Sequence, residues 1–264
     1  MKAVILAAGV GSRLARPFPK CMSLLPTGEQ ILGRQIRIYR EAGIREIFVV
    51  TGFKKNLLME EFSDVFYKYN PLFYLTNTSK SLLCILEYLD DDVIWSNGDV
   101  VFDPEVVHKI VGHPFNTIAV NRDRCGAEEV KYLADDKDSL LEISKSVESA
   151  HGEAVGVNKI LRESVPDLVG SLRECQDTDY FEKGVEICLQ KGVPFKVLDI
   201  SEHRCIEVDF EEDLHQAREI FSENPSGKQM HIQGKQGSNG NSSKSGLALM
   251  NTEFLRFLSS GTAG

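Results

Sequence analysis

Apolar runs alternate with amphipathic stretches along the first 122 residues of the chain. Strands that are buried on both faces form continuous apolar runs, whereas helices place apolar residues three or four positions apart. The pattern predicts strands at 3–8, 46–52, 73–77, 92–102 and 116–122, and helices at 31–43, 54–66, 81–89 and 104–112. This alternation predicts an α/β fold, in which a parallel sheet carries helices on both faces.

The pattern changes in the second half of the chain. Residues 126–157 predict antiparallel excursions, and "AVGVNKI" continues them to residue 160. A helix at about 178–191, strands at 195–201 and 205–210 and a last helix at 211–221 follow. These elements complete a globular domain over residues 1–221.

The composition changes again after Phe221. Residues 222–246 are rich in Ser, Gly, Asn, Lys and Gln and nearly free of apolar residues, which predicts a flexible linker. The apolar stretch "LALMNTEFLRFL" then begins a terminal stub at 247–264. Two interpretations remain open: the stub begins a second, truncated domain, or it is a small docking helix in a disordered tail.

Charge and cysteine content limit the classes of partner. The 264 residues carry a net charge of −9, which argues against nucleic acid or an anionic membrane as the main partner. The sequence has no apolar run of about 20 residues and no secretory cleavage pattern, so a cytoplasmic protein is expected. The six cysteines form no CxxC pair, which favours reduced thiols over a zinc site or a disulfide framework.

The opening stretch "KAVILAAGVGSRLARPFPKC" joins a buried strand to a cationic loop. Gly9 and Gly11 allow a ligand to approach the backbone, and the cations that follow indicate an anionic ligand such as phosphate. Leu14 stands where the dinucleotide fingerprint requires a small residue, and the mononucleotide loop's GK[ST] is absent. Neither standard phosphate loop fits.

The combination "LAAGxGSRL" with a following Pro19-Lys20 resembles the signature of the nucleotidyltransferases that make sugar nucleotides and cytidylyl alcohols. The resemblance covers about residues 1–221. It implies a Rossmann-like three-layer sandwich with a mostly parallel mixed sheet, and a catalytic Lys20 and Arg13. "TNTSKSL" resembles the family's nucleotide-contacting stretch. The nucleotide-binding residues that the resemblance implies are Leu6, Ala8, Gly9, Gly11, Ser12, Asn77 and Ser81.

The resemblance also implies a metal site. Asp99 in "SNGDVVF" and Asp209 in "IEVDFEEDL" match the family's two metal-binding aspartates. Carboxylates from two separate strands suit Mg²⁺, a hard cation that prefers oxygen ligands.

Three short segments, "AEEVKY", "EISKS" and "HGEAVGV", resemble acceptor-side elements of cytidylyltransferases that act on small phospho-alcohols and phosphonates. The resemblance implies that Lys145 meets the acceptor anion and that Glu129, Lys131 and Glu153 line its pocket. For Glu129 and Lys131, a cross-strand surface pair is an equal alternative. The loop from Ala15 to Phe18 is shorter than in most choline-phosphate and sugar-1-phosphate enzymes of the family, which leaves the acceptor and the role of Arg16 open.

The terminal "MNTEFLRFLSSGTAG" resembles the start of a phosphoenolpyruvate mutase domain, which implies a phosphonate acceptor. We therefore expect magnesium-dependent transfer of CMP from CTP to a small phosphonate, such as 2-hydroxyethylphosphonate or 2-aminoethylphosphonate, with release of pyrophosphate. Two alternatives stay open: a sugar-1-phosphate or choline-phosphate nucleotidyltransferase, and a nucleotide-sensing module without turnover. A dinucleotide-dependent oxidoreductase is disfavoured by Leu14 and by the Pro-Lys pair.

Overall fold

The structure, a computed structural model, describes residues 1–11, 17–126 and 129–222. Its strands are β1 (Lys2–Ala7), β2 (Ile47–Thr51), β3 (Phe66–Tyr69), β4 (Val93–Asn97), β5 (Val100–Phe102), β6 (Thr117–Asn121), β7 (Lys131–Ala134), β8 (Leu140–Ser144), β9 (Glu153–Ile160), β10 (Lys196–Asp199) and β11 (Cys205–Glu207). Its α-helices are α1 (Ile31–Glu41), α2 (Lys55–Glu61), α3 (Thr78–Leu86), α4 (Pro104–Gly112), α5 (Val165–Glu174), α6 (Phe181–Gln190) and α7 (Glu211–Ile220). Short 3₁₀ helices lie at Lys20–Met22 and Arg162–Ser164.

The main sheet is mixed and mostly parallel, as predicted. Its strand order is β10-β6-β9-β4-β1-β2-β3, and β1 pairs in parallel with both β2 and β4. β9 runs antiparallel between β4 and β6, and the β7–β8 hairpin extends from it. The start of β9 therefore lies at the same edge of the sheet as the carboxyl ends of β1 and β4.

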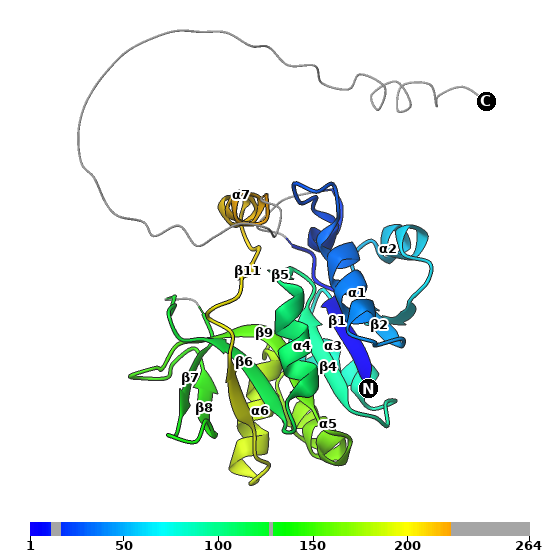
Figure 1. The fold of residues 1–264 in the computed structure, drawn as a ribbon. Coiled ribbons are helices and arrows are strands. Elements are labelled where there is room, and N and C mark those ends of the chain that lie inside the picture. The colour runs from blue at the N-terminus through cyan, green and yellow to red at the C-terminus, as the bar shows by residue number, and fades with distance from the viewer. Residues whose placement is uncertain (12–16, 127–128, 223–264) are drawn as a thin grey trace, which may run out of the picture. The chain divides into compact units, whose positions relative to one another are not determined.

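Helices cover both faces of this sheet, which confirms the three-layer architecture (Figure 1). Successive residues of a strand point to opposite faces, so β1 contributes to two separate cores. Val4 and Leu6 pack in a core with α3, α5 and α6, whereas Ile5 packs in a core with α1 and α4. All six residues of β1 are at least half-buried, which explains its continuous apolar sequence.

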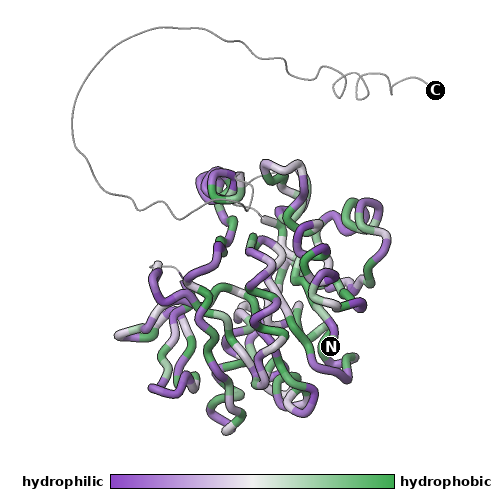
Figure 2. The backbone as a smooth tube through the Cα atoms, viewed as in Figure 1, coloured by the Kyte–Doolittle hydropathy of each residue, from purple (hydrophilic) through white to green (hydrophobic). Residues whose placement is uncertain are grey.

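The last helix packs away from the two main cores. β11 pairs antiparallel with β5, and α7 covers this two-stranded ribbon through a third apolar cluster that includes Val101, Ile206 and Leu214. Most of α7 is hydrophilic, as its colour in Figure 2 shows, and only Leu214 and Ala217 are buried in it. This attachment fixes the chain segment that follows β11.

Several predicted elements differ from the structure. The strand expected at 73–77 is wrong, because the edge strand that pairs with β2 is Phe66–Tyr69. The helix before it ends at Glu61 rather than at residue 66. The strand expected at 92–102 is divided into β4 and β5 by a turn at Gly98 and Asp99. Helix α5 was not predicted, because Pro166 and Gly170 obscured its amphipathic pattern.

Within the described residues, no helix is long and apolar enough to cross a bilayer. The predicted linker and stub lie outside the described residues from position 223 onwards.

Candidate active site

A pocket of about 310 Å³ opens where the carboxyl ends of β1 and β4 meet the start of β9. In α/β sheets, this edge is where ligands bind. Segments far apart in the sequence contribute to it, from the opening loop, the start of α3, the start of α6 and the residues after β11. Nine of the predicted site residues line this pocket: Leu6, Gly9, Gly11, Lys20, Asn77, Asp99, Glu129, Lys145 and Asp209.

Lys20 lies between the two predicted metal ligands. Its Nζ donates to Asp99 Oδ2 at 2.7 Å and also to Asp209 Oδ1. Burial alone would lower the pKa of Lys20, but the two carboxylates outweigh this effect and raise its pKa above the ordinary value. The lysine is therefore fully charged at any physiological pH. Gly11 has a positive φ of 63°, and a Cβ there would lie 3.1 Å from the Lys20 Cβ, so the glycine loop packs directly against this lysine.

Asp99 is positioned by the tight turn after β4. The Gly98 N–H donates to the Leu6 carbonyl at 2.9 Å, and a Cβ on Gly98 would lie 2.9 Å from that oxygen. No side chain larger than hydrogen fits there without a shift of the backbone. On the other side, the Val208 N–H donates to the Asp99 carbonyl at 3.0 Å. These backbone contacts bring the segment that carries Asp209 beside Asp99.

Three carboxylates converge at this point, because Glu207 joins the two aspartates. One oxygen from each of Asp99, Glu207 and Asp209 lies within 4.8 Å of the others. Burial raises the pKa of Glu207 well above its usual range, and the charges of both aspartates add to the effect. Glu207 was not predicted from the sequence. Residues two apart on a strand share a face, so the spacing from Asp209 in "IEVDF" could have indicated Glu207 as its neighbour.

The donor set suits a divalent cation. Asp99 Oδ1 is buried and has no hydrogen-bond partner among the described residues, which costs free energy unless a ligand satisfies it. Oxygen-only ligands from a few carboxylates are what Mg²⁺ prefers, with water and phosphate oxygens completing its shell. Asp99, Glu207 and Asp209 are therefore the residues that would hold magnesium in this chain.

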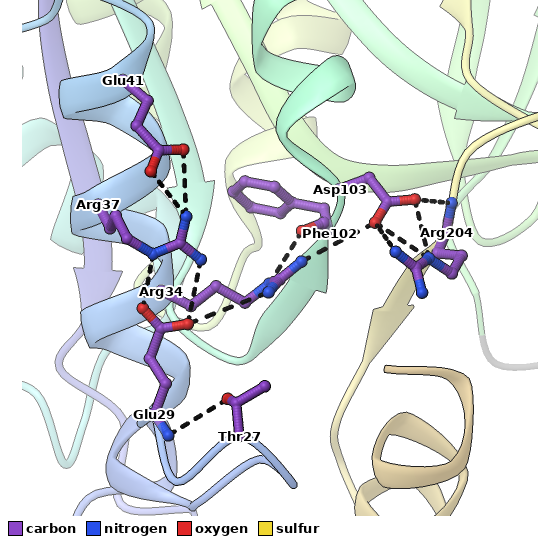
Figure 3. A network of polar contacts seen from close by, with 8 residues as sticks. All are labelled: Thr27, Glu29, Arg34, Arg37, Glu41, Phe102, Asp103 and Arg204. Atoms are coloured by element: carbon purple, nitrogen blue, oxygen red, sulfur yellow. Dashed lines mark hydrogen bonds and ion pairs between the residues drawn. The ribbon is translucent and has the colours of Figure 1, made fainter. Parts of the chain in front are cut away.

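The segment carrying Glu207 and Asp209 is held to the body of the domain by an ionic network, which Figure 3 shows. Arg204, just before β11, donates to Asp103 through Nε at 3.0 Å and Nη2 at 2.8 Å, and its Nη1 donates to the Ile220 carbonyl at 3.0 Å. Its guanidinium and that of Arg34 lie 4.8 and 4.7 Å from the Phe221 ring centroid. One arginine thus joins β5, β11 and the end of α7.

The opposite side of the pocket is formed by the start of α6 and the loop after β8. Tyr180, Glu182 and Lys145 line it, and Lys145 Nζ lies 5.0 Å from the Tyr180 ring centroid. Asn77 caps α3 by accepting from the Thr78 N–H at 2.8 Å. Its amide also donates to the Thr178 carbonyl at 3.3 Å, which connects α3 to the segment that carries Tyr180. Tyr180 and Glu182 carried no motif in the sequence.

The sequence profile of the MobA-like NTP transferase domain matches residues 3–167. The match spans most of the sheet and includes Lys20 and Asp99. The chain belongs to the MobA-like NTP transferase family.

Two curated relatives of this MobA-like chain have names that include CTP or a CMP product. The CMP-5'-(3-aminopropyl)phosphonate synthase of Streptomyces rubellomurinus is 33% identical over 123 residues, which are 43% of this chain and 19% of that protein. The CTP:phosphoglutamine cytidylyltransferase of Campylobacter jejuni is 24% identical over 250 residues, covering 81% of this chain and 98% of the relative. The chain thus spans only a fifth of the first relative but nearly all of the second.

Solved structures share the fold. The CTP:phosphocholine cytidylyltransferase of Streptococcus pneumoniae aligns with a TM-score of 0.71 at 23% identity, over 83% of this chain and 98% of that one. The inositol-1-phosphate CTP transferase of T. maritima aligns with a TM-score of 0.70 at 19% identity, over 84% and 94%. Nucleotidyltransferases thus have the architecture expected from the sequence.

Two predicted nucleotide contacts of the MobA-like domain lie outside the pocket lining. Ser81 is buried inside α3, where its hydroxyl accepts from the Asn70 amide at 3.2 Å. Ala8 is buried, and its carbonyl accepts from the Phe53 N–H at 3.1 Å. Both positions are occupied by structural hydrogen bonds. Ser12 and Arg13 lie outside the described residues, so their predicted roles stay predictions.

Two predicted acceptor contacts also lie beside the pocket rather than in its lining. Lys131 and Glu153 face each other where β7 pairs with β9. Glu153 Oε2 accepts from the Gly126 N–H at 3.0 Å. This register fits the cross-strand alternative for Lys131, with Glu153 rather than Glu129 opposite it.

Proposed function

We propose that this chain is a magnesium-dependent cytidylyltransferase, which transfers CMP from CTP to a small phosphonate and releases pyrophosphate. The observation that carries the proposal is the contact of Lys20 with Asp99 and Asp209 at the carboxyl edge of the sheet. A cation and a carboxylate cluster at one point suit a reaction between two polyanions, which repel each other and must be held together.

The lysine stabilises charge at the α-phosphorus. The acceptor oxygen attacks this phosphorus in line, and its lone pair forms the new P–O bond. The bond from the α-phosphorus to the oxygen that bridges it to the β-phosphate breaks, and its electron pair leaves on the pyrophosphate oxygen. No general base is required, because a phosphonate is already ionised at neutral pH. Lys20 is positioned to donate to the α-phosphate, and its raised pKa keeps it protonated throughout.

The carboxylates prepare the site for its cation. Asp99, Glu207 and Asp209 would hold Mg²⁺, which supplies Lewis-acid charge for the phosphate and phosphonate oxygens. The Gly9 and Gly11 backbone lines the pocket beside Lys20, where amide groups can face the triphosphate. Ser12 and Arg13 directly follow Gly11 in the sequence, and we assign them to the departing pyrophosphate.

The choice of CTP and of a phosphonate is supported by the relatives. Two relatives and two structural neighbours carry CTP or a CMP product in their names. The Streptomyces relative is named for a CMP-phosphonate, and 43% of the present chain aligns with it. Lys145 lines the pocket and supplies a cation for the acceptor anion. We assign the acceptor to this side, next to Glu129.

The proposal is tested by pyrophosphate release. The protein is incubated with magnesium, each of the four nucleoside triphosphates and a panel of phosphonates, choline phosphate and sugar phosphates. Release with CTP and a phosphonate supports the proposal. Release only with a sugar phosphate would reassign the acceptor, and absence of release with every pair would favour a nucleotide-sensing module.

A further inference from the structure

Glu182 is a buried carboxylate that the proposed reaction does not use. It lies in the first turn of α6, directly after Phe181, whose ring packs edge-on against Trp95 at 5.7 Å between centroids. Only 7% of Glu182 is exposed, yet the residue lines the pocket. Its Oε2 is buried and has no hydrogen-bond partner in the part of the chain that the structure describes. The packing of Phe181 therefore holds a carboxylate against the pocket without satisfying it.

A buried carboxylate without a partner is costly, so its retention needs a compensating interaction. The charge of Lys145 acts to lower the pKa of Glu182, against the larger effect of burial. Lys145, however, lies over the Tyr180 ring, and no ion pair within 4.0 Å joins it to Glu182 among the described residues. One carboxylate oxygen of Glu182 thus has no partner within the described residues, although the residue lines the pocket.

The overall charge of the pocket favours a cationic ligand group at this position. Among the described residues, the lining contains five carboxylates (Asp99, Glu129, Glu182, Glu207 and Asp209) but only two lysines (Lys20 and Lys145). A bound Mg²⁺ together with Lys20 would offset the three carboxylates of Asp99, Glu207 and Asp209. Glu129 and Glu182 lie among the acceptor-side residues, where in the described lining their two carboxylates outnumber the one cation, Lys145, and would repel a purely anionic acceptor.

We infer that the acceptor carries a primary ammonium group and that the Glu182 carboxylate binds it. The inference rests on the proposed function and narrows it: of the two phosphonates expected, 2-aminoethylphosphonate fits and 2-hydroxyethylphosphonate does not. The phosphonate end would meet Lys145 and the carboxylate-bound cation, and the ammonium end would meet Glu182. A zwitterionic acceptor thereby balances both the lysine and the glutamate.

A primary ammonium fits better than a quaternary one. A quaternary ammonium has no N–H to donate and is recognised by several aromatic faces. Tyr180 is the one aromatic side chain in the described lining, whereas Glu182 offers an oxygen with open hydrogen-bonding capacity. An N–H donor satisfies that oxygen directly, and a trimethylammonium group does not.

The test compares acceptors that differ only in the terminal group. Steady-state kcat/KM is measured with CTP, magnesium and 2-aminoethylphosphonate, 2-hydroxyethylphosphonate or choline phosphate, for the wild type and Glu182→Gln. Glu186→Gln, one turn later on α6 and paired with Lys183 at the surface, is the matched control. We expect the wild type to prefer the amino acceptor, and Glu182→Gln to lower the amino-to-hydroxy ratio of kcat/KM by at least about 30-fold. Glu186→Gln should keep the wild-type ratio.

Two results would overturn the inference and leave the proposed function standing. Equal use of the amino and hydroxy acceptors by the wild type removes it while leaving the proposed cytidylyltransferase intact. If Glu182→Gln lowers kcat/KM equally with the amino and the hydroxy acceptor, the residue contributes to packing and does not bind the ammonium group. If no acceptor reacts with CTP at all, the proposed function fails and the inference fails with it.

Discussion

Lys20 Nζ lies 2.7 Å from Asp99 Oδ2, although 79 positions separate the two residues in the chain. The contact joins the opening loop to the turn after β4 and places the cation beside the carboxylate cluster. Asp209 accepts from the same Nζ, so one lysine contacts both predicted metal ligands. Mutations at this contact should affect turnover far more than folding, because the fold's two cores lie on either side of the sheet.

Lys20→Ala should lower kcat by about 100-fold or more, the usual loss for one preorganised charge stabiliser. The measurement is pyrophosphate release at saturating CTP and magnesium. Lys109→Ala, which removes a surface lysine paired with Glu202, is the control and should stay near wild type. Near-wild-type turnover of Lys20→Ala would remove this lysine from the mechanism.

Asp99→Asn and Asp209→Asn should each abolish the activation of turnover by magnesium, and Glu207→Gln should weaken it. All three remove a negative oxygen ligand from the cluster. The readout is activity over a magnesium titration, together with the shift in melting temperature that magnesium causes. Asp90→Asn, at an exposed ion pair with Arg162, is the control. A variant that keeps full magnesium activation would show that its residue is no ligand.

Gly98→Ala should displace the backbone turn that carries Asp99 and thereby impair the site. A Cβ there would lie 2.9 Å from the Leu6 carbonyl and 3.1 Å from the Ala7 Cβ, so the turn that carries Asp99 must move. We expect a loss of about 1–3 kcal/mol in the free energy of unfolding, the usual cost of overpacking, and a higher magnesium requirement. Gly112→Ala meets nothing within 4 Å and is the control. Equal stability of the two variants in urea denaturation would contradict the prediction.

Glu182→Gln should stabilise the unliganded protein in a pH-dependent way. Burial raises the pKa of Glu182 from 4.5 to about 7, against the opposing effect of Lys145. The folded state therefore holds this proton more tightly than the unfolded state, and wild-type stability falls as pH rises from about 4.5 to 7. Above pH 7 the variant should be more stable by about 1–3 kcal/mol, and the difference should shrink towards pH 5.

Denaturant unfolding at pH 5 and pH 8 measures this difference, with Glu186→Gln as the control. If the difference in unfolding free energy between wild type and Glu182→Gln is the same at both pH values, burial does not raise the pKa of Glu182. The expected gain in stability together with a loss of acceptor selectivity is the signature of a group retained for binding.

Arg204→Ala should loosen the segment that carries Glu207 and Asp209. It removes the partly exposed Arg204 guanidinium from Asp103, which keeps only the longer pair with Arg34 at 3.8 Å, and it removes the donor to the Ile220 carbonyl. The loss should cost about 1–3 kcal/mol. Arg204→Lys should restore little, since a lysine cannot form the bidentate contact. Thermal unfolding and a magnesium titration check both effects. Arg173→Ala, at an exposed pair with Glu87, should be silent.

The main elements of the fold could be predicted from the sequence because their signals are local. A buried parallel strand must be apolar throughout, so β1 and β2 were evident, and the glycine loop and Lys20 followed at once. Asp99 and Asp209 were predicted because "SNGDVVF" and "IEVDFEEDL" resemble the family's metal-binding motifs. The edge strand β3 was missed, because its pairing with β2, rather than its own composition, makes it a strand.

Tertiary structure alone decided which polar residues face the pocket. Ser81 and Glu182 both lie near the start of a helix, yet Ser81 is satisfied by Asn70 inside the fold and Glu182 meets the pocket with an unsatisfied oxygen. Sequence spacing determines the face of an element on which a residue lies, but not what packs against that face. The sequence by itself thus determined the buried strand that leads into the glycine loop, and it predicted a lysine and two aspartates as site residues. Only packing in three dimensions decided that Glu207 lies beside Asp99 and Asp209, and that Glu182 lines the pocket with an oxygen that no described residue satisfies.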